Sequence, residues 1–139
     1  MSFNIQKTIV MLRTLQLTAH NAHHITKGPH GLQDHELLGE IYPSADTYYD
    51  SLVELAISNN DEPLQEVLSG QRSATLVPKL YKAENNNLDE VLKRIDIVVE
   101  FATLARKEKD VPGKIDTLLG DMQRDFGTFQ YKLKFLLAE

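Results

Sequence analysis

The sequence predicts an all-α protein, a four-helix bundle built as a single domain over residues 1–139. Apolar residues recur at intervals of three and four in four long segments, which is the spacing of one face of an α-helix. No segment of comparable length shows the alternation typical of a strand. With 42% hydrophobic and 25% charged residues, the 139-residue chain has an ordinary globular composition and the length for one core.

The first predicted helix covers residues 3 to about 26. Its apolar positions are Ile5, Ile9, Val10, Leu12, Leu15, Leu17 and Ala19. Ser2 suits the N-cap position because its hydroxyl can accept a hydrogen bond from a free backbone N–H. Gly28 and Pro29 end the helix, since glycine suits a left-handed residue after a helix and proline cannot continue one.

The second predicted helix begins near Gln33 or Asp34 and ends within residues 58–60. Its apolar positions are Leu37, Leu38, Ile41, Ala45, Tyr49, Leu52, Val53 and Ala56. Pro43 lies inside this segment. We expect a kink or a short break there, because proline lacks a backbone N–H and clashes with the preceding turn.

Two further helices are predicted over residues 88–107 and 112–137, the first of them after a cap region of three asparagines at residues 85–87. Residues 61–85 form a long connection with a short helix from Pro63 to Leu68. Short turns pair neighbouring helices antiparallel, and a long middle connection joins the two pairs in a ferritin-like bundle with one crossover. A simple up-and-down bundle with an irregular middle loop is the alternative.

Composition excludes several classes of protein. The chain has no cysteine, which rules out disulfide scaffolds, thiolate zinc sites and cysteine nucleophiles. No apolar run reaches the length of a membrane span and no signal peptide is recognisable, so we expect a cytoplasmic protein without a membrane partner. The net charge of −5 argues against a surface devoted to nucleic acid. Residues 1–33 nevertheless carry +3 and no acid, which leaves −8 for the rest.

All five histidines lie between residues 20 and 35. His20, His23 and His24 are spaced i, i+3 and i+4, so they share one side of the first helix. His35 begins the second helix across the turn, where it can converge with His23. The alternative is that these histidines are partly buried or surface polar groups.

Two carboxylates lie on one face of the second predicted helix, because Asp50 and Glu54 are spaced i, i+4. Imidazoles together with carboxylates, without thiolates, suit iron, manganese or zinc. His35 and Asp50 are fifteen residues apart, or about 22 Å along one helix, so they cannot bind one metal ion within one chain. Either they belong to two unrelated half-sites, or two chains share the site across a two-fold contact. A solvated helical face is the alternative for the two acids.

The histidine segment resembles the Dps family of mini-ferritins. That family carries a His-Asn-x-His-Trp-x-x-x-Gly-Pro segment, and here residues 20–29 read His-Asn-Ala-His-His-Ile-Thr-Lys-Gly-Pro. In the family a second ligand histidine follows after twelve residues and an Asp-x-x-x-Glu pair begins after fifteen more. The spacings from His23 to His35 and from His35 to Asp50 are the same. Glu40, Tyr42 and the 131–137 ending also resemble the family in character.

The resemblance implies a hollow dodecamer that oxidises ferrous iron, usually with hydrogen peroxide, and stores the ferric mineral inside. It implies that His23 and His35 of one chain and Asp50 and Glu54 of its neighbour are both the metal ligands and the catalytic residues of a ferroxidase. Carboxylates stabilise ferric iron, whereas imidazole holds ferrous iron without adding charge.

One departure from the family affects the second iron position. Family members usually have a carboxylate one turn after the second histidine, and this chain has Gly39 there. Glu36 and Glu40 lie nearby in sequence but about 100 to 140 degrees around the helix from His35. The sequence therefore predicts a weak second iron position.

Other departures make the surroundings of the histidines more polar than in the family. His24 replaces a tryptophan, and Gly31 and Asp34 replace a phenylalanine and an apolar residue. We expect His24 to fill space or to support a ligand. The role of His20 stays open.

The chain ends bear on DNA binding. Some family members bind DNA through a flexible basic tail. Helix signals here start by Phe3, and the C-terminal Ala138 and Glu139 are short and acidic, so we expect no tail-mediated DNA binding.

Four acids of the C-terminal segment could line three-fold entry pores for iron, although a solvated face explains them at least as well. They are Asp110, Asp116, Asp121 and Asp125.

Three functions are therefore open. The leading one is a ferroxidase and iron store. The second is a metal-storing shell with weak or no ferroxidase activity, because Gly39 replaces a ligand. The third is a zinc- or copper-binding protein that uses the histidine cluster alone.

Overall fold

The computed structural model describes residues 2–138 and confirms an all-α, ferritin-like bundle. The four long helices are α1 (Phe3–His24), α2 (Gly31–Ser58), α5 (Leu88–Arg106) and α6 (Gly113–Leu137). Two short helices, α3 (Gln65–Leu68) and α4 (Gln71–Leu76), lie in the connection between α2 and α5. Glu139 lies outside the described residues, so the acidic ending expected from it has no structural account.

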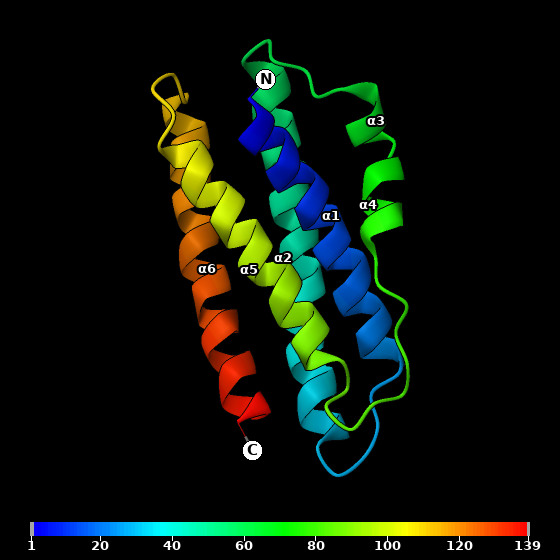
Figure 1. Ribbon diagram of the computed structural model, residues 1–139. Helices are drawn as coiled ribbons and strands as arrows, with labels where there is room; N and C mark the ends of the chain where they lie inside the picture. The colour runs from blue at the N-terminus through cyan, green and yellow to red at the C-terminus, as the bar shows by residue number, and fades with distance from the viewer. Residues whose placement is uncertain (1, 139) are drawn as a thin grey trace.

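The topology distinguishes the two bundle architectures. In Figure 1 the connection that carries α3 and α4 runs the length of the bundle beside α1, and α5 begins at the end where α2 begins. Helix α1 packs on α2 and α5, while α6 packs on α5 and α2. The chain therefore forms two antiparallel pairs joined by one long crossover, and the simple up-and-down bundle is excluded.

The core lies between the four long helices. Its large side chains have less than 2% of their surface exposed. They include Ile9, Leu12 and Leu15 of α1; Leu38, Ile41 and Leu52 of α2; Ile95 of α5; and Leu119, Met122, Phe126 and Leu133 of α6. These residues recur with helical spacing, so the periodicity that predicted the helices also gives the buried faces.

The ends of α1 depend on the residues expected there. The Ser2 hydroxyl accepts a hydrogen bond from the backbone N–H of Ile5 at 3.0 Å and caps the helix. The helix ends at His24, two residues before the predicted end, and Gly28 follows in the left-handed region with φ of 87°. Helix α2 then begins at Gly31, slightly earlier than predicted.

Pro43 does not break α2, which contradicts the short break expected there. Proline removes one hydrogen bond and crowds the carbonyl four residues before it, which here belongs to Gly39. A glycine at that position leaves the backbone freedom to adjust. Helix α2 also packs against α1 and α6, and these contacts stabilise it as one continuous helix.

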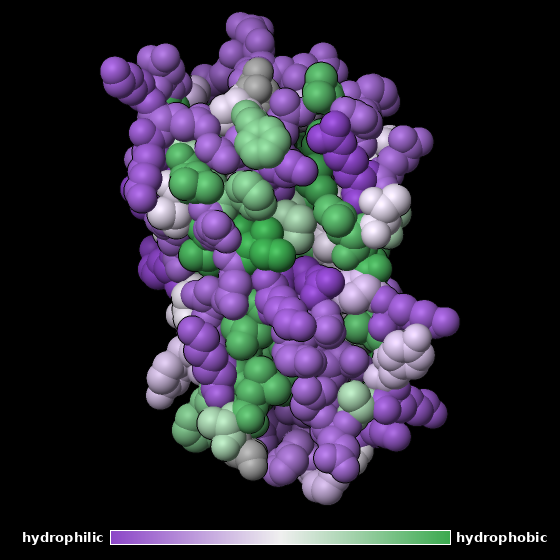
Figure 2. Space-filling view, in the orientation of Figure 1, coloured by the Kyte–Doolittle hydropathy of each residue, from purple (hydrophilic) through white to green (hydrophobic). Residues whose placement is uncertain are grey.

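Part of the surface is apolar. Figure 2 shows green apolar side chains gathered in patches between purple hydrophilic ones. Phe3 is 66% exposed, its ring lies 6.4 Å from that of Phe101 on α5, and the Lys7 ammonium lies 5.5 Å from the Phe3 ring. Leu32, Tyr131 and Phe135 are also largely exposed.

Candidate metal site

The end of α1 and the start of α2 bring two histidines into contact. The turn over residues 25–30 reverses the chain, and the centroids of the His23 and His35 rings lie 3.7 Å apart. His35 is exposed and His23 is half-buried. Two imidazoles from consecutive helices therefore face one another at an accessible position.

A hydrogen bond orients His35. Its Nδ1 lies 3.0 Å from the backbone carbonyl oxygen of His23 and 3.3 Å from the Thr26 hydroxyl. A carbonyl oxygen only accepts, so Nδ1 carries the proton in this contact and donates it. The lone pair of a neutral His35 ring is then on Nε2, which is the arrangement that metal-binding histidines show when a carbonyl holds the other nitrogen.

His23 is biased toward its neutral form. Burial lowers the pKa of His23, and the neighbouring His35, His24 and His20 lower it further. A neutral imidazole has a lone pair free for a metal ion, whereas a protonated one does not. The Nδ1 atom of His23 is buried and has no hydrogen-bond partner.

Gly39 faces His23. A Cβ built on Gly39 would lie 3.2 Å from Cε1 and 3.6 Å from Nδ1 of His23. A side chain at residue 39 would therefore point at the unpartnered nitrogen. A carboxylate there could accept a hydrogen bond from Nδ1 or reach a metal ion beside the ring, and glycine supplies neither.

Three further rings extend the cluster along α1 and α2. The centroids of His20 and His24 lie 4.4 Å apart, and the Tyr42 ring stacks on His20 at 4.1 Å with an angle of 16° between the planes. Tyr42 also meets His23 edge to face at 5.3 Å. The spacing of the histidines predicted that they share a side of α1. It did not predict the stack, although Tyr42 follows His35 by seven residues, two turns further on the same face of α2.

Asp50 and Glu54 lie apart from the histidines within one chain. Both are exposed on the C-terminal half of α2. Glu54 lines a shallow depression together with Lys114 and Asp121 of α6. Since α2 is continuous from residue 31 to residue 58, the estimated separation of about 22 Å between His35 and Asp50 applies. Within residues 2–138, no three His, Asp or Glu side chains converge closely enough to hold a metal ion.

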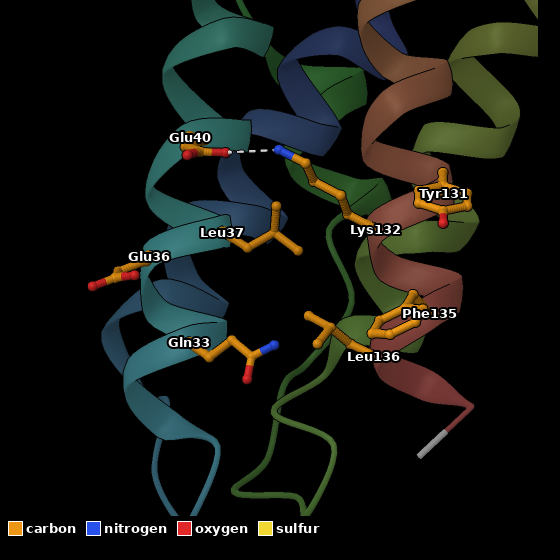
Figure 3. A pocket seen from close by; sticks show the side chains of 8 residues that line it. All are labelled: Gln33, Glu36, Leu37, Glu40, Tyr131, Lys132, Phe135 and Leu136. Carbon is orange, nitrogen blue, oxygen red and sulfur yellow. Dashed lines mark ion pairs between the residues drawn. The ribbon is translucent and has the colours of Figure 1, made fainter.

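Glu36 and Glu40 belong to a separate groove between α2 and α6 (Figure 3). Glu40 forms an ion pair with Lys132 of α6 at 3.7 Å, whereas Glu36 points away from α6. Leu37 and Leu136 face each other across the same groove. Neither glutamate replaces the carboxylate that Gly39 lacks.

A buried polar network holds the turn that carries the histidines, and the sequence analysis missed it. The Asn86 side chain accepts from the Lys27 backbone N–H at 2.9 Å and donates to the Lys27 carbonyl at 3.0 Å. It also donates to Asp34 Oδ2 at 2.7 Å. Asn86 and Asn87 have φ of 51° and 62°, a left-handed conformation that asparagine tolerates better than most residues. The run of three asparagines was the available signal.

Three of the acids considered for an entry pore have partners in the chain. Asp116 pairs with Arg106 at 2.9 Å, and Asp121 pairs with Arg124 at 3.5 Å. Asp125 accepts a hydrogen bond from the Tyr48 hydroxyl. The Arg106 guanidinium holds the pKa of Asp116 below its ordinary value.

The structure resembles solved Dps proteins over nearly its whole length. Dps from Microbacterium arborescens in a high-iron form superposes with a TM-score of 0.85 and 17% identity, over 98% of this chain and 91% of that one. The chain has a Dps-like, ferritin-like fold. Dps92 from Deinococcus radiodurans matches with a TM-score of 0.80 and 19% identity, over 96% of this chain and 83% of that one.

The sequence of this chain is less similar to known proteins than its fold is. Neither a protein-family model nor a curated protein matches it. Identities below 20% with the two Dps structures relate the folds, and the resemblance of residues 20–54 to the Dps pattern is the further link. Within residues 2–138, none of the helices is long and apolar enough to cross a membrane.

Proposed function

We propose that this protein is a mini-ferritin that oxidises ferrous iron and stores the ferric product inside a hollow dodecamer. Hydrogen peroxide is the proposed oxidant, and the reaction removes both agents of oxidative damage. The proposed site joins His23 and His35 of one chain to Asp50 and Glu54 of a neighbouring chain. The proposed location is the cytoplasm.

The observation that carries the proposal is the oriented pair of histidines. The hydrogen bond from His35 Nδ1 to the His23 carbonyl supports a lone pair on Nε2, and burial of His23 supports a neutral ring beside it. Both features favour metal binding by imidazole. Ferric iron also needs anionic oxygen ligands, and the α2 carboxylates lie too far along the helix to supply them within one chain.

If two chains share the site, the histidines and the carboxylates no longer need to come from the same α2 helix. In a two-fold contact the histidine end of one α2 can face the carboxylate end of the other, and each pair of chains then holds two equivalent sites. The exposed side chains of Leu32, Tyr131 and Phe135 support contact with further copies. Twelve chains of 15.8 kDa give a particle of about 190 kDa.

In the proposed reaction, residues of this chain bind the ferrous ion, balance its charge and orient a ligand. The ferrous ion is the substrate, and His23 and His35 bind it through neutral nitrogens. Asp50 and Glu54 of the neighbouring chain balance the charge that rises when the ion is oxidised. The carbonyl of His23 keeps the His35 ring oriented throughout.

A second candidate function is a metal-storing shell with weak ferroxidase activity, and Gly39 is the observation that favours it. Peroxide accepts two electrons, so oxidation is fastest where two ferrous ions lie together. Without a carboxylate at residue 39, and with Glu40 paired to Lys132, the second ion has fewer ligands.

Two measurements test the proposed function. Light scattering should find a particle of about 190 kDa, and a monomer or simple dimer at neutral pH would contradict it. Stopped-flow absorbance after addition of ferrous iron, with and without peroxide, should show oxidation faster than in buffer. His35→Ala and Glu54→Ala should each abolish that acceleration. A particle that binds iron without accelerating its oxidation would favour the storage shell.

A further inference from the structure

We propose that His20 and His24 form a second metal site, selective for a borderline divalent cation such as Zn(II) or Cu(II), beside the His23 and His35 pair. The inference rests on the proposed function in one respect only, since it assigns His23 and His35 to iron. His20 and His24 are then the remaining rings of the cluster, and the iron site does not need them.

The two side chains have the geometry of a chelating pair. They lie at i and i+4 on α1, so both project from one side of the helix one turn apart. Their ring centroids are 4.4 Å apart. Two nitrogens that bind one ion at about 2.0 to 2.1 Å lie roughly 3 Å from each other, and rings at this separation reach that arrangement by small rotations.

His23 is less suited to join this pair. Its ring centroid lies 6.4 Å from that of His20 and 5.9 Å from that of His24, but only 3.7 Å from that of His35. The cluster therefore divides into two pairs, His20 with His24 and His23 with His35. Each pair offers two imidazoles to its own ion.

Tyr42 positions the proposed site. Its ring stacks on His20 at 4.1 Å and nearly parallel, on the side of α2 that faces α1. His20 is half-buried under this contact, whereas His24 is exposed. The stack limits the rotation of His20, so less conformational freedom is lost when the ring binds an ion. His24 then completes the chelate from the solvent side.

The donor set determines which ion binds. The pair supplies nitrogen only, and no third His, Asp or Glu of residues 2–138 completes it. Imidazole suits zinc, copper and nickel, whereas ferric iron needs the carboxylates that this pair lacks. Water fills the remaining positions, so the ion is exchangeable.

Zinc titration of the metal-free assembled protein tests this inference, since zinc is not oxidised and reports binding alone. Calorimetry should find two zinc ions per chain, and metal analysis at equilibrium with a fixed concentration of free zinc should give the same count. His20→Ala and His24→Ala should each reduce the count to one, and His35→Ala should remove the other ion. His30→Ala, a histidine outside the cluster, should keep both. Circular dichroism and particle size confirm that each variant folds and assembles.

The outcomes separate this inference from the proposed function. If His20→Ala and His24→Ala keep the wild-type zinc count while His35→Ala loses an ion, the second site is refuted and the iron site stands. If His35→Ala and Glu54→Ala change neither zinc binding nor iron oxidation while His20→Ala abolishes zinc binding, the second site stands and the proposed function fails. Absence of zinc binding in the wild type refutes the second site directly.

The role of Tyr42 has its own test. Tyr42→Phe keeps the stacked ring and should bind zinc as the wild type does. Tyr42→Leu removes the ring and should weaken the His20 and His24 site by about tenfold, the lower end of what supporting residues contribute to metal affinity. Equal affinities in the two variants would contradict the positioning role.

Discussion

Replacing Gly39 with alanine should stabilise the protein while it displaces a metal ligand. The added Cβ would lie 3.2 Å from Cε1 and 3.6 Å from Nδ1 of His23. Alanine is favoured over glycine in a helix interior by about 1 kcal/mol. The opposing cost is small, because the end of the His23 side chain needs to move only a few tenths of an ångström. A rotation of a few degrees is far below the roughly 30° that costs about 0.5 to 1.5 kcal/mol.

The free energy of unfolding should therefore rise by about 0.5 to 1 kcal/mol in Gly39→Ala. For 139 residues this corresponds to an increase in Tm of about 2 to 3 °C, measured by thermal unfolding at one fixed protein concentration. The initial rate of iron oxidation should fall in the same variant, because the His23 ring has moved.

Gly127→Ala is the matched control. Gly127 also lies within a long helix, and a Cβ there would meet nothing within 4 Å. Gly127→Ala should raise the free energy of unfolding by the full helix-propensity difference of about 1 kcal/mol, and the rate of iron oxidation should not change. If Gly39→Ala instead lowers the free energy of unfolding by more than about 1 kcal/mol while Gly127→Ala raises it, the His23 ring is held rigidly and the reasoning is wrong.

Three further substitutions have expected outcomes. Gly39→Asp shifts the His23 ring as Gly39→Ala does, but it adds a carboxylate ligand that outweighs the shift. It should therefore raise the iron bound per site from about one toward two and speed oxidation by peroxide, as measured by metal analysis and stopped-flow absorbance. Asn86→Asp should lower the free energy of unfolding by at least about 3 kcal/mol in urea titrations, because it places a second carboxylate against buried Asp34 and removes two donated hydrogen bonds. Tyr48→Phe should lower the free energy of unfolding by about 1 kcal/mol, because it removes the hydrogen bond to Asp125. Burial and that hydrogen bond raise the pKa of Tyr48, so this contribution is present below about pH 10 and is lost as the pH rises further.

Each of these has a control or a contradicting result. A wild type that already binds two irons per site, or a Gly39→Asp variant with unchanged stoichiometry, would make Gly39 a packing accommodation only. Asn85→Asp keeps the side-chain oxygen that accepts from the Asn87 N–H and should cost far less than Asn86→Asp. An effect of Tyr48→Phe that is equal at pH 8 and pH 11 would show that hydroxyl ionisation does not contribute.

The helices could be predicted because their determinants are local. The 3.6-residue rhythm of α1, its Ser2 cap and the left-handed Gly28 are each decided within a few residues. The lengths of the connections favoured the crossover but left the up-and-down bundle open, and the structure decided between them. Continuity through Pro43 could not be predicted, because it depends on the packing of α2 against two other helices.

The candidate site was predictable only in part. The approach of His23 and His35 follows from a short turn between two helices, which the sequence displays. The hydrogen bonds between Asn86 and Lys27 join residues 59 positions apart, and sequence spacing does not predict contacts at that separation. The stack of Tyr42 on His20 depends likewise on how the axes of α1 and α2 cross, which side-chain packing decides.

An anomalous difference map of iron-loaded crystals would locate the iron relative to both chains. A peak is expected at each two-fold interface, bound by His23 and His35 of one chain and by Asp50 and Glu54 of the neighbouring chain. Iron on the histidines with no carboxylate from a second chain, or no iron at such an interface, would contradict the shared site.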